Sequence, residues 1–130
     1  MDITLYGLDG LNKWRSYCTT QTGDSGRECI AGTEMNFDGM ENARMYGAFL
    51  ASGRVTMSFL DGELIPTVVA AAPQVAAAGA MDTALVPLFS DGVHLQHWPN
   101  HDNHIHVRVS EAEYTTSGTR TLPVVVFEPP

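Results

Sequence analysis

Alternating hydrophobic and polar positions predict three β-strands, at residues 2–6, 54–61 and 103–109. In the first of them Ile3 and Leu5 fall on one face, because successive side chains of a strand point to opposite sides. An aliphatic run near the end of the chain predicts a fourth strand within 119–128. Together these segments are expected to form an antiparallel or mixed sheet.

A helix is predicted from Asp38 to Ala51. Asp38 is followed three residues later by Glu41, which is the spacing of a capping box, and Gly53 is suited to end the helix. The predicted apolar stripe of this helix consists of Met40, Ala43, Gly47 and Leu50.

A second helical segment is predicted from about Leu64, after an Asp-Gly turn. Pro66 suits the first turn of that helix, whereas Pro73 is expected to kink it or end it. Residues 84–89 are short and apolar, and we interpret them as a strand weakened by Pro87. The sum predicts a small α+β domain in which two or three helices flank the central sheet.

Residues 7–36 are rich in Gly, Thr, Ser and Asp and predict a long loop, with a helical turn around Leu11 to Tyr17. Cys18 and Cys29 lie in this loop, eleven positions apart. They are either a loop-closing disulfide formed in an oxidising compartment or two separate free thiols. Their spacing disfavours a zinc site.

Composition narrows the class of protein. The chain has 130 residues, enough for one domain, and a formal net charge of −8. An acidic surface repels nucleic acid and anionic lipid, so neither is an expected partner. No membrane span is expected, because the Ala/Val-rich stretch 68–80 is shorter than roughly 18 residues and contains Pro73. The first residues lack the basic and apolar regions of a signal peptide.

All five histidines of the chain fall between residues 94 and 106. Strand alternation puts His104, His106 and Arg108 on one face of the segment 103–109, and its aliphatic residues on the other. The aliphatic face belongs to the core, so the histidine face is expected to point into a cleft or into solvent. His101 precedes this strand on a loop, whereas His94 and His97 are expected to be peripheral.

Two imidazoles on one strand face can share a metal ion, or one can bind the metal while the other acts on a substrate. Zinc sites of enzymes usually have three protein ligands, often His together with Asp or Glu, and one water. The candidate carboxylates are Asp102 and Glu111 near the cluster and Asp2 far from it. Asp2 stands at the head of a predicted core strand, where a carboxylate is costly unless it has a function.

The segment "HDNHIHVRV" resembles the second zinc motif of the LAS metallopeptidases, particularly the penicillin-insensitive murein endopeptidases and related D-Ala-D-Ala carboxypeptidases. Those enzymes carry H-D-x-H-x-H before an alternating aliphatic strand that contains an Arg. The resemblance implies that His106 binds zinc and that His104 lines the active centre. His101 and Asp102 match the preceding His-Asp pair.

The first motif of the same family is His, six residues, then Asp, leading into a strand. "MDITLYG" looks like the end of that motif, which implies that Asp2 is the second zinc ligand. The His of the motif would stand seven residues before Asp2, and the chain does not contain it. We therefore expect residues 1–130 to be a single domain that forms the C-terminal portion of an N-terminally truncated catalytic domain, with a LAS core like that of hedgehog and DD-peptidase domains.

The resemblance implies zinc-dependent hydrolysis of peptide bonds in the stem or cross-link peptides of peptidoglycan, by an endopeptidase or a D,D-carboxypeptidase. His104 is the first candidate for the base or the oxyanion stabiliser, and His101 is the second. Asp102 is a candidate for orienting a histidine ring. With two ligands only, Asp2 and His106, this chain alone is expected to bind Zn²⁺ weakly and to be inactive. A cell-wall substrate implies a periplasmic or extracellular location.

Two alternatives remain. His104, His106, Glu111 and Gly118 fit the spacing of the first cupin motif, but the Gly expected six residues before the first His is Trp98. The second alternative is a non-catalytic cell-wall-binding relative that keeps the fold and lacks the first zinc ligand.

Overall fold

The computed structural model of the chain describes residues 1–110, 112–116 and 120–124. Its elements follow one another along the chain as β1 (Asp2–Tyr6), β2 (Asn12–Lys13), β3 (Thr20–Gly23), β4 (Gly26–Cys29), α1 (Gly39–Leu50), β5 (Val55–Leu60), α2 (Ile65–Ala77), the 3₁₀ helix η1 (Thr83–Phe89), β6 (Leu95–His97), β7 (His104–Val109), β8 (Ala112–Thr116) and β9 (Arg120–Val124).

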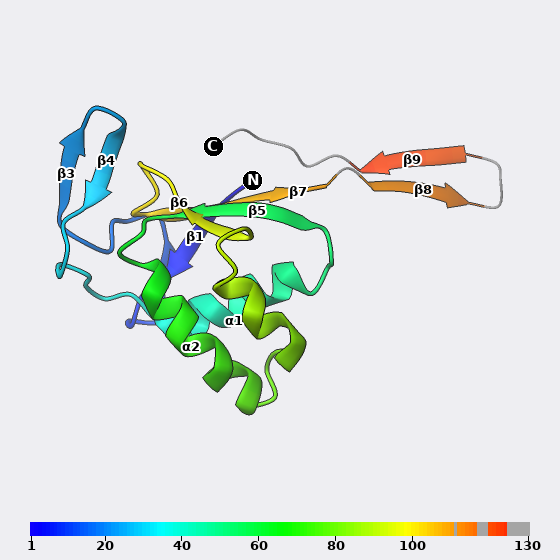
Figure 1. Ribbon diagram of the computed structural model, residues 1–130, viewed down its shortest axis with the longest axis horizontal. Helices are drawn as coiled ribbons and strands as arrows, with labels where there is room; N and C mark the ends of the chain where they lie inside the picture. The colour runs from blue at the N-terminus through cyan, green and yellow to red at the C-terminus, as the bar shows by residue number, and fades with distance from the viewer. Residues whose placement is uncertain (111, 117–119, 125–130) are drawn as a thin grey trace.

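Five of these strands form one sheet in the order β2-β1-β7-β5-β6. β6 runs parallel to β5, and the other neighbours in the sheet are antiparallel. The prediction of a small α+β domain with a mixed sheet is therefore confirmed. Strands β3 and β4 form a separate hairpin, and β8 pairs with β9 in another. In Figure 1 these two hairpins extend from opposite ends of the molecule.

Both α-helices lie on the same side of the sheet (Figure 1). The aliphatic side chains of β7 belong to the core that these helices cover, as strand alternation predicts. This core also takes in Leu5 of β1, Leu60 of β5, Leu50 of α1 and Val68 of α2. The histidines of β7 therefore lie on the side of the sheet that the helices leave uncovered.

A bulge in β5 changes which of its side chains reach each face. Val55 pairs with Val109, but the register shifts before Met57, which pairs with Arg108. An inserted residue reverses the alternation beyond it. Phe59 consequently pairs with His106 and stands on the histidine side, whereas Leu60 enters the core. Simple alternation along 54–61 predicts that Val55, Met57 and Phe59 share one face, and the bulge makes that prediction wrong.

The predicted helical turn around Leu11 to Tyr17 is also wrong. Gly10 adopts a positive φ of 81°, and the Asp9 carboxylate accepts a hydrogen bond from the backbone N–H of Leu11 at 3.0 Å. This turn sends the chain back along β1 as strand β2. The rest of the predicted loop contains the β3–β4 hairpin, and a disulfide joins Cys18 to Cys29.

The first helix is confirmed, since the Asp38 side chain accepts a hydrogen bond from the backbone N–H of Glu41 at 3.0 Å. The Glu41 carboxylate pairs with Arg44 instead of completing a capping box. Met40 does not belong to the buried stripe, because it is 42% exposed. Its place in the stripe is taken by Tyr46, which is buried.

The second helix continues through Pro73 and ends at Ala77, so Pro73 does not end it. The alanine-rich sequence on both sides favours the helix strongly enough to tolerate the backbone N–H donor that Pro73 lacks. Residues 84–89 belong to the 3₁₀ helix η1, and the predicted strand is wrong there. The Asp82 side chain accepts a hydrogen bond from Ala84 N–H at 2.9 Å and begins that turn.

The predicted strand within 119–128 corresponds to β9 over Arg120–Val124, and its other positions lie outside the described residues. None of the helices in the described part of the chain is long and apolar enough to cross a membrane.

Candidate functional site

The two predicted zinc ligands, Asp2 and His106, lie side by side although they are at opposite ends of the sequence. Strands β1 and β7 are antiparallel neighbours, and their register pairs Asp2 directly with His106. The Nδ1 atom of His106 is 2.6 Å from Oδ1 of Asp2. The Nε2 atom of His104 lies 3.8 Å from the same carboxylate oxygen. The Asp2 carboxylate therefore touches the ring of His106 and lies near the ring of His104.

His101 joins this group from the loop before β7. Its ring centroid lies 4.6 Å from that of His104 and 6.3 Å from that of His106. The Nδ1 atom of His101 donates to the backbone carbonyl of Pro99 at 2.7 Å. In a neutral ring this bond leaves Nε2 with its lone pair available as a base or a ligand.

Aromatic side chains cover the histidine face, which strand alternation predicts to point into a cleft or into solvent. His104 and His106 are buried, with 8% and 3% of their surface exposed. The indole of Trp14 stacks on His104 at a centroid distance of 4.5 Å. Phe59, turned to this side by the bulge in β5, packs against His106 at 6.1 Å. The two imidazoles are therefore shielded by rings, whereas the Asp2 side chain, expected at the head of a core strand, is 50% exposed.

The electrostatics of the site favour neutral imidazoles beside an ionised carboxylate. Burial and the neighbouring His101 lower the pKa of His104 to about 4. Burial likewise lowers the pKa of His101. Burial opposes ionisation of Asp2, but the hydrogen bond from His106 and the nearby His104 outweigh it and hold the pKa of Asp2 below its usual value.

The orientation of His104 supports a cation-binding role for this group. Its Nδ1 atom is 2.7 Å from Oδ1 of Asn103, which is an acceptor, so Nδ1 carries the proton. The Nε2 atom then presents a lone pair to the Asp2 carboxylate. Two electron-rich atoms facing each other favour a metal ion between them.

Asp102 has a different role from its neighbours. Its buried carboxylate accepts hydrogen bonds from Nε of Arg27 at 2.7 Å and from the Ser16 hydroxyl at 2.5 Å. We therefore assign Asp102 to holding the β3–β4 hairpin and the segment after Trp14 against the site. These two partners occupy the Asp102 carboxylate, and the predicted orientation of a histidine ring by Asp102 stays a prediction.

The same hairpin is fixed to the histidine loop through Asn100. Asn100 N–H donates to the carbonyl of Arg27 at 2.7 Å, and the Asn100 side chain accepts from Arg27 N–H at 2.8 Å. Gly26 has a φ of 131°, and a Cβ there would lie 2.6 Å from the Asn100 side chain. Only glycine allows so close an approach.

The two upstream histidines lie outside this group. The His94 ring contacts the Asp91 carboxylate at 2.5 Å. The His97 ring lies between Glu28, 2.8 Å from Nε2, and the backbone N–H of Gly62, 2.8 Å from Nδ1. Glu111 and Gly118 lie outside the described residues.

No set of three or more His, Cys, Asp or Glu side chains in the described part of the chain is arranged to hold a metal ion. The donors that converge are Asp2 and His106, with His104 somewhat farther from them. These residue types are ones that zinc accepts as ligands.

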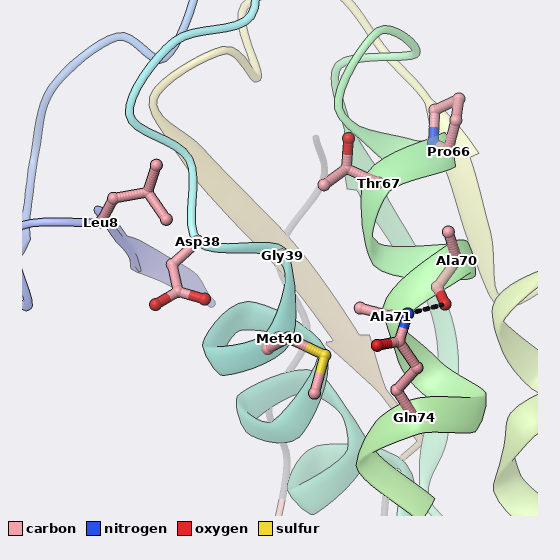
Figure 2. Close-up of a pocket in the computed structure, with 9 residues that line it drawn as sticks. All are labelled: Leu8, Asp38, Gly39, Met40, Pro66, Thr67, Ala70, Ala71 and Gln74. Atoms are coloured by element: carbon pink, nitrogen blue, oxygen red, sulfur yellow. Dashed lines mark hydrogen bonds between the residues drawn. The ribbon is translucent and has the colours of Figure 1, made fainter.

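A hollow of about 500 Å³ lies elsewhere, between the start of α1 and helix α2. Figure 2 shows that its lining is mostly apolar. Asp38, the acidic residue there, already caps α1, and Gln74 donates to the carbonyl of Ala70 at 3.4 Å. This hollow offers no reactive group, so the histidine site is the better functional candidate.

Sequence reasoning missed the side chains that enclose and support the site, namely Trp14, Ser16, Arg27 and Phe59. Trp14, Ser16 and Arg27 come from a Gly/Thr/Ser-rich stretch without periodicity, which gave no signal of their position. The strand pattern predicted that Phe59 is buried, but the bulge places it on the histidine side of the sheet and not in the core.

Acidification is expected to destabilise the metal-free protein through His104. Its pKa is about 4 in the folded protein against 6.5 for an unperturbed histidine, so the unfolded chain takes up a proton first as pH falls. Stability is then lost between those two values, by roughly 1–3 kcal/mol. Urea unfolding in EDTA at a series of pH values measures this loss. His104→Gln should reduce the loss, and His94→Gln should leave it as it is; an equal loss in all three proteins would contradict the assignment.

Comparisons with known protein families, with curated proteins and with solved structures found no match to this chain.

Proposed function

We propose that this chain carries part of the zinc site of a LAS-type metallopeptidase that hydrolyses peptide bonds in peptidoglycan stem or cross-link peptides. The observation that carries the proposal is the contact between Asp2 and His106, 2.6 Å apart although they are separated by nearly the whole described chain. The two motifs that resemble this family, of which the first is only half present, contribute one residue each to that contact.

The two side chains in this contact are of types that zinc accepts as ligands. Asp2 and His106 are the proposed ligands, and the motif assigns a third ligand to a histidine seven residues before Asp2, which this chain does not contain. When bound, zinc lowers the pKa of a coordinated water and polarises the carbonyl of the scissile amide.

The surrounding residues have separate parts in the proposed reaction. His104, held by Asn103 with its Nε2 toward Asp2, takes a proton from the attacking water and returns it to the leaving amine. Its low pKa keeps it unprotonated at neutral pH. His101, fixed by the carbonyl of Pro99, is the second candidate for that base. The rings of Trp14 and Phe59 limit the access of bulk water to these groups.

The disulfide between Cys18 and Cys29 supports a periplasmic or extracellular location, because disulfides persist in oxidising compartments. The same bond holds the segment after Trp14 to β4, which carries Arg27. An oxidising environment would therefore also preserve the support of the site.

The fold argues against the cupin alternative. Cupins are double-sheet jelly rolls, whereas this chain has a mixed five-stranded sheet with α-helices on one side. The non-catalytic cell-wall-binding relative remains the second candidate function, because the described residues contribute two of the three zinc ligands of the motif.

Digestion of cross-linked muropeptides, followed by mass spectrometry, tests the proposal. With zinc, this chain alone should release little product, and a form extended by the residues encoded before Met1 should cleave if these include the motif's histidine. Free imidazole, added as a substitute ligand, should raise the activity of the short chain. Absence of cleavage in every form, together with co-sedimentation with insoluble peptidoglycan, would instead identify a binding protein.

A further inference from the structure

A second hollow, of about 370 Å³, adjoins the loop that carries His101. It is lined by Ser25, Glu28, His97, Trp98 and Pro99. One wall comes from the β3–β4 hairpin and the other from the segment that leads out of β6. None of the functions assigned above uses this hollow.

The hollow is joined to the histidine site by direct contacts. The carbonyls of Trp98 and Pro99, which belong to its wall, accept the hydrogen bond from His101. The indole of Trp98 packs on Phe59 at 5.2 Å, and Phe59 packs on His106. The hollow therefore shares its wall with the residues that support the histidine site.

The charge of the hollow is negative. Nδ1 of His97 accepts a hydrogen bond from Gly62 N–H, so the ring proton sits on Nε2 and is donated to Glu28. A ring with one proton is neutral, so this bond orients the Glu28 carboxylate without cancelling its charge. The nearby guanidinium of Arg27 is bound to Asp102. Among the described residues that line the hollow, none is Lys or Arg.

Trp98 adds a second feature that favours a cation. Its side chain is 46% exposed, although it packs on Phe59. The exposed part of an indole attracts an ammonium group and covers the methylene groups that lead to it. A carboxylate and an indole at one hollow are complementary to a flexible chain that ends in a primary ammonium group.

We propose that this hollow is a subsite for the ammonium group of a basic or diamino-acid side chain in the substrate peptide. Glu28 pairs with the charge, and Trp98 packs against the chain that carries it. The identification of the ligand as part of a peptide rests on the proposed function, whereas the preference for an ammonium group rests on the hollow itself.

The probe is Nα-acetyl-L-lysine N-methylamide, compared with its norleucine analogue, which has a similar chain without the charge. Titrations followed by NMR, in EDTA, should shift the Trp98 indole N–H signal with the lysine probe. The norleucine analogue should bind roughly fivefold to tenfold more weakly. Glu28→Gln should weaken lysine binding by a similar factor and keep the contact with His97.

Asp24→Asn is the matched control, since it removes the same charge from the turn of the same hairpin, outside the lining of the hollow. It should leave the binding of the lysine probe unchanged. Equal affinity for the two probes, no binding of either, or equal losses in Glu28→Gln and Asp24→Asn would overturn the proposal. Because the titration needs neither zinc nor hydrolysis, its result is independent of the muropeptide test of the proposed function.

Discussion

Replacing His106 with alanine is expected to lower the zinc affinity of the protein by on the order of 100-fold or more. His106 and Asp2 are the two ligands that this chain contributes, and their atoms already lie 2.6 Å apart. Loss of either leaves a single strong donor, so Asp2→Asn should have an effect of similar size. Competition of the protein with a chromophoric zinc chelator measures these affinities.

His94→Ala is the matched control, because His94 contacts Asp91 away from the site. Its zinc affinity should equal that of the unmodified chain. Tight one-to-one binding that His106→Ala abolishes and Asp2→Ala leaves untouched would exclude the proposed ligand pair. If none of the variants changes the affinity, the contact between Asp2 and His106 serves only to join β1 to β7.

The central contact of the site could be anticipated because it depends on regular elements. Strict alternation identified β1 and β7, and it placed His104 and His106 on one face. The pairing of Asp2 with His106 was suggested by the family motifs, and the antiparallel register of the two strands provides it. Alternation alone does not specify which strands are neighbours.

The enclosure of the site could not be anticipated, because it depends on long-range contacts of irregular segments. Trp14 reaches His104 from just after β2, whose direction is set by the turn at Asp9 and Gly10. The hairpin that carries Arg27 is fixed by pairing with Asn100, far away in sequence. Neither contact has a periodic signature that a single sequence would reveal.

The bulge in β5 is another feature that the sequence alone does not predict. Val55 and Phe59 are four positions apart, so simple alternation places them on one face, yet one inserted residue puts them on opposite faces. No glycine marks this position in the sequence. Phe59 is nevertheless the ring that links His106 to Trp98, so a local irregularity determines the surroundings of the candidate ligand.

Removing the disulfide, by the double replacement Cys18→Ala and Cys29→Ala, is expected to destabilise the protein by about 3 kcal/mol. The bond closes a loop between positions eleven residues apart, and opening that loop raises the conformational entropy of the unfolded chain. Both cysteines are buried in the core, so the replacement also removes packing there. Urea unfolding of the variant and the unmodified protein measures the change.

The control is reduction of the unmodified protein with dithiothreitol, which should reproduce most of the loss and leave the double variant unaffected. The disulfide also ties the segment after Trp14 to β4, whose Arg27 binds Asp102. Reduction should therefore loosen the stack of Trp14 on His104 before the whole domain unfolds, which tryptophan fluorescence can follow. An unfolding midpoint that reduction does not change would show that packing alone, and not the covalent link, holds this segment over the histidines.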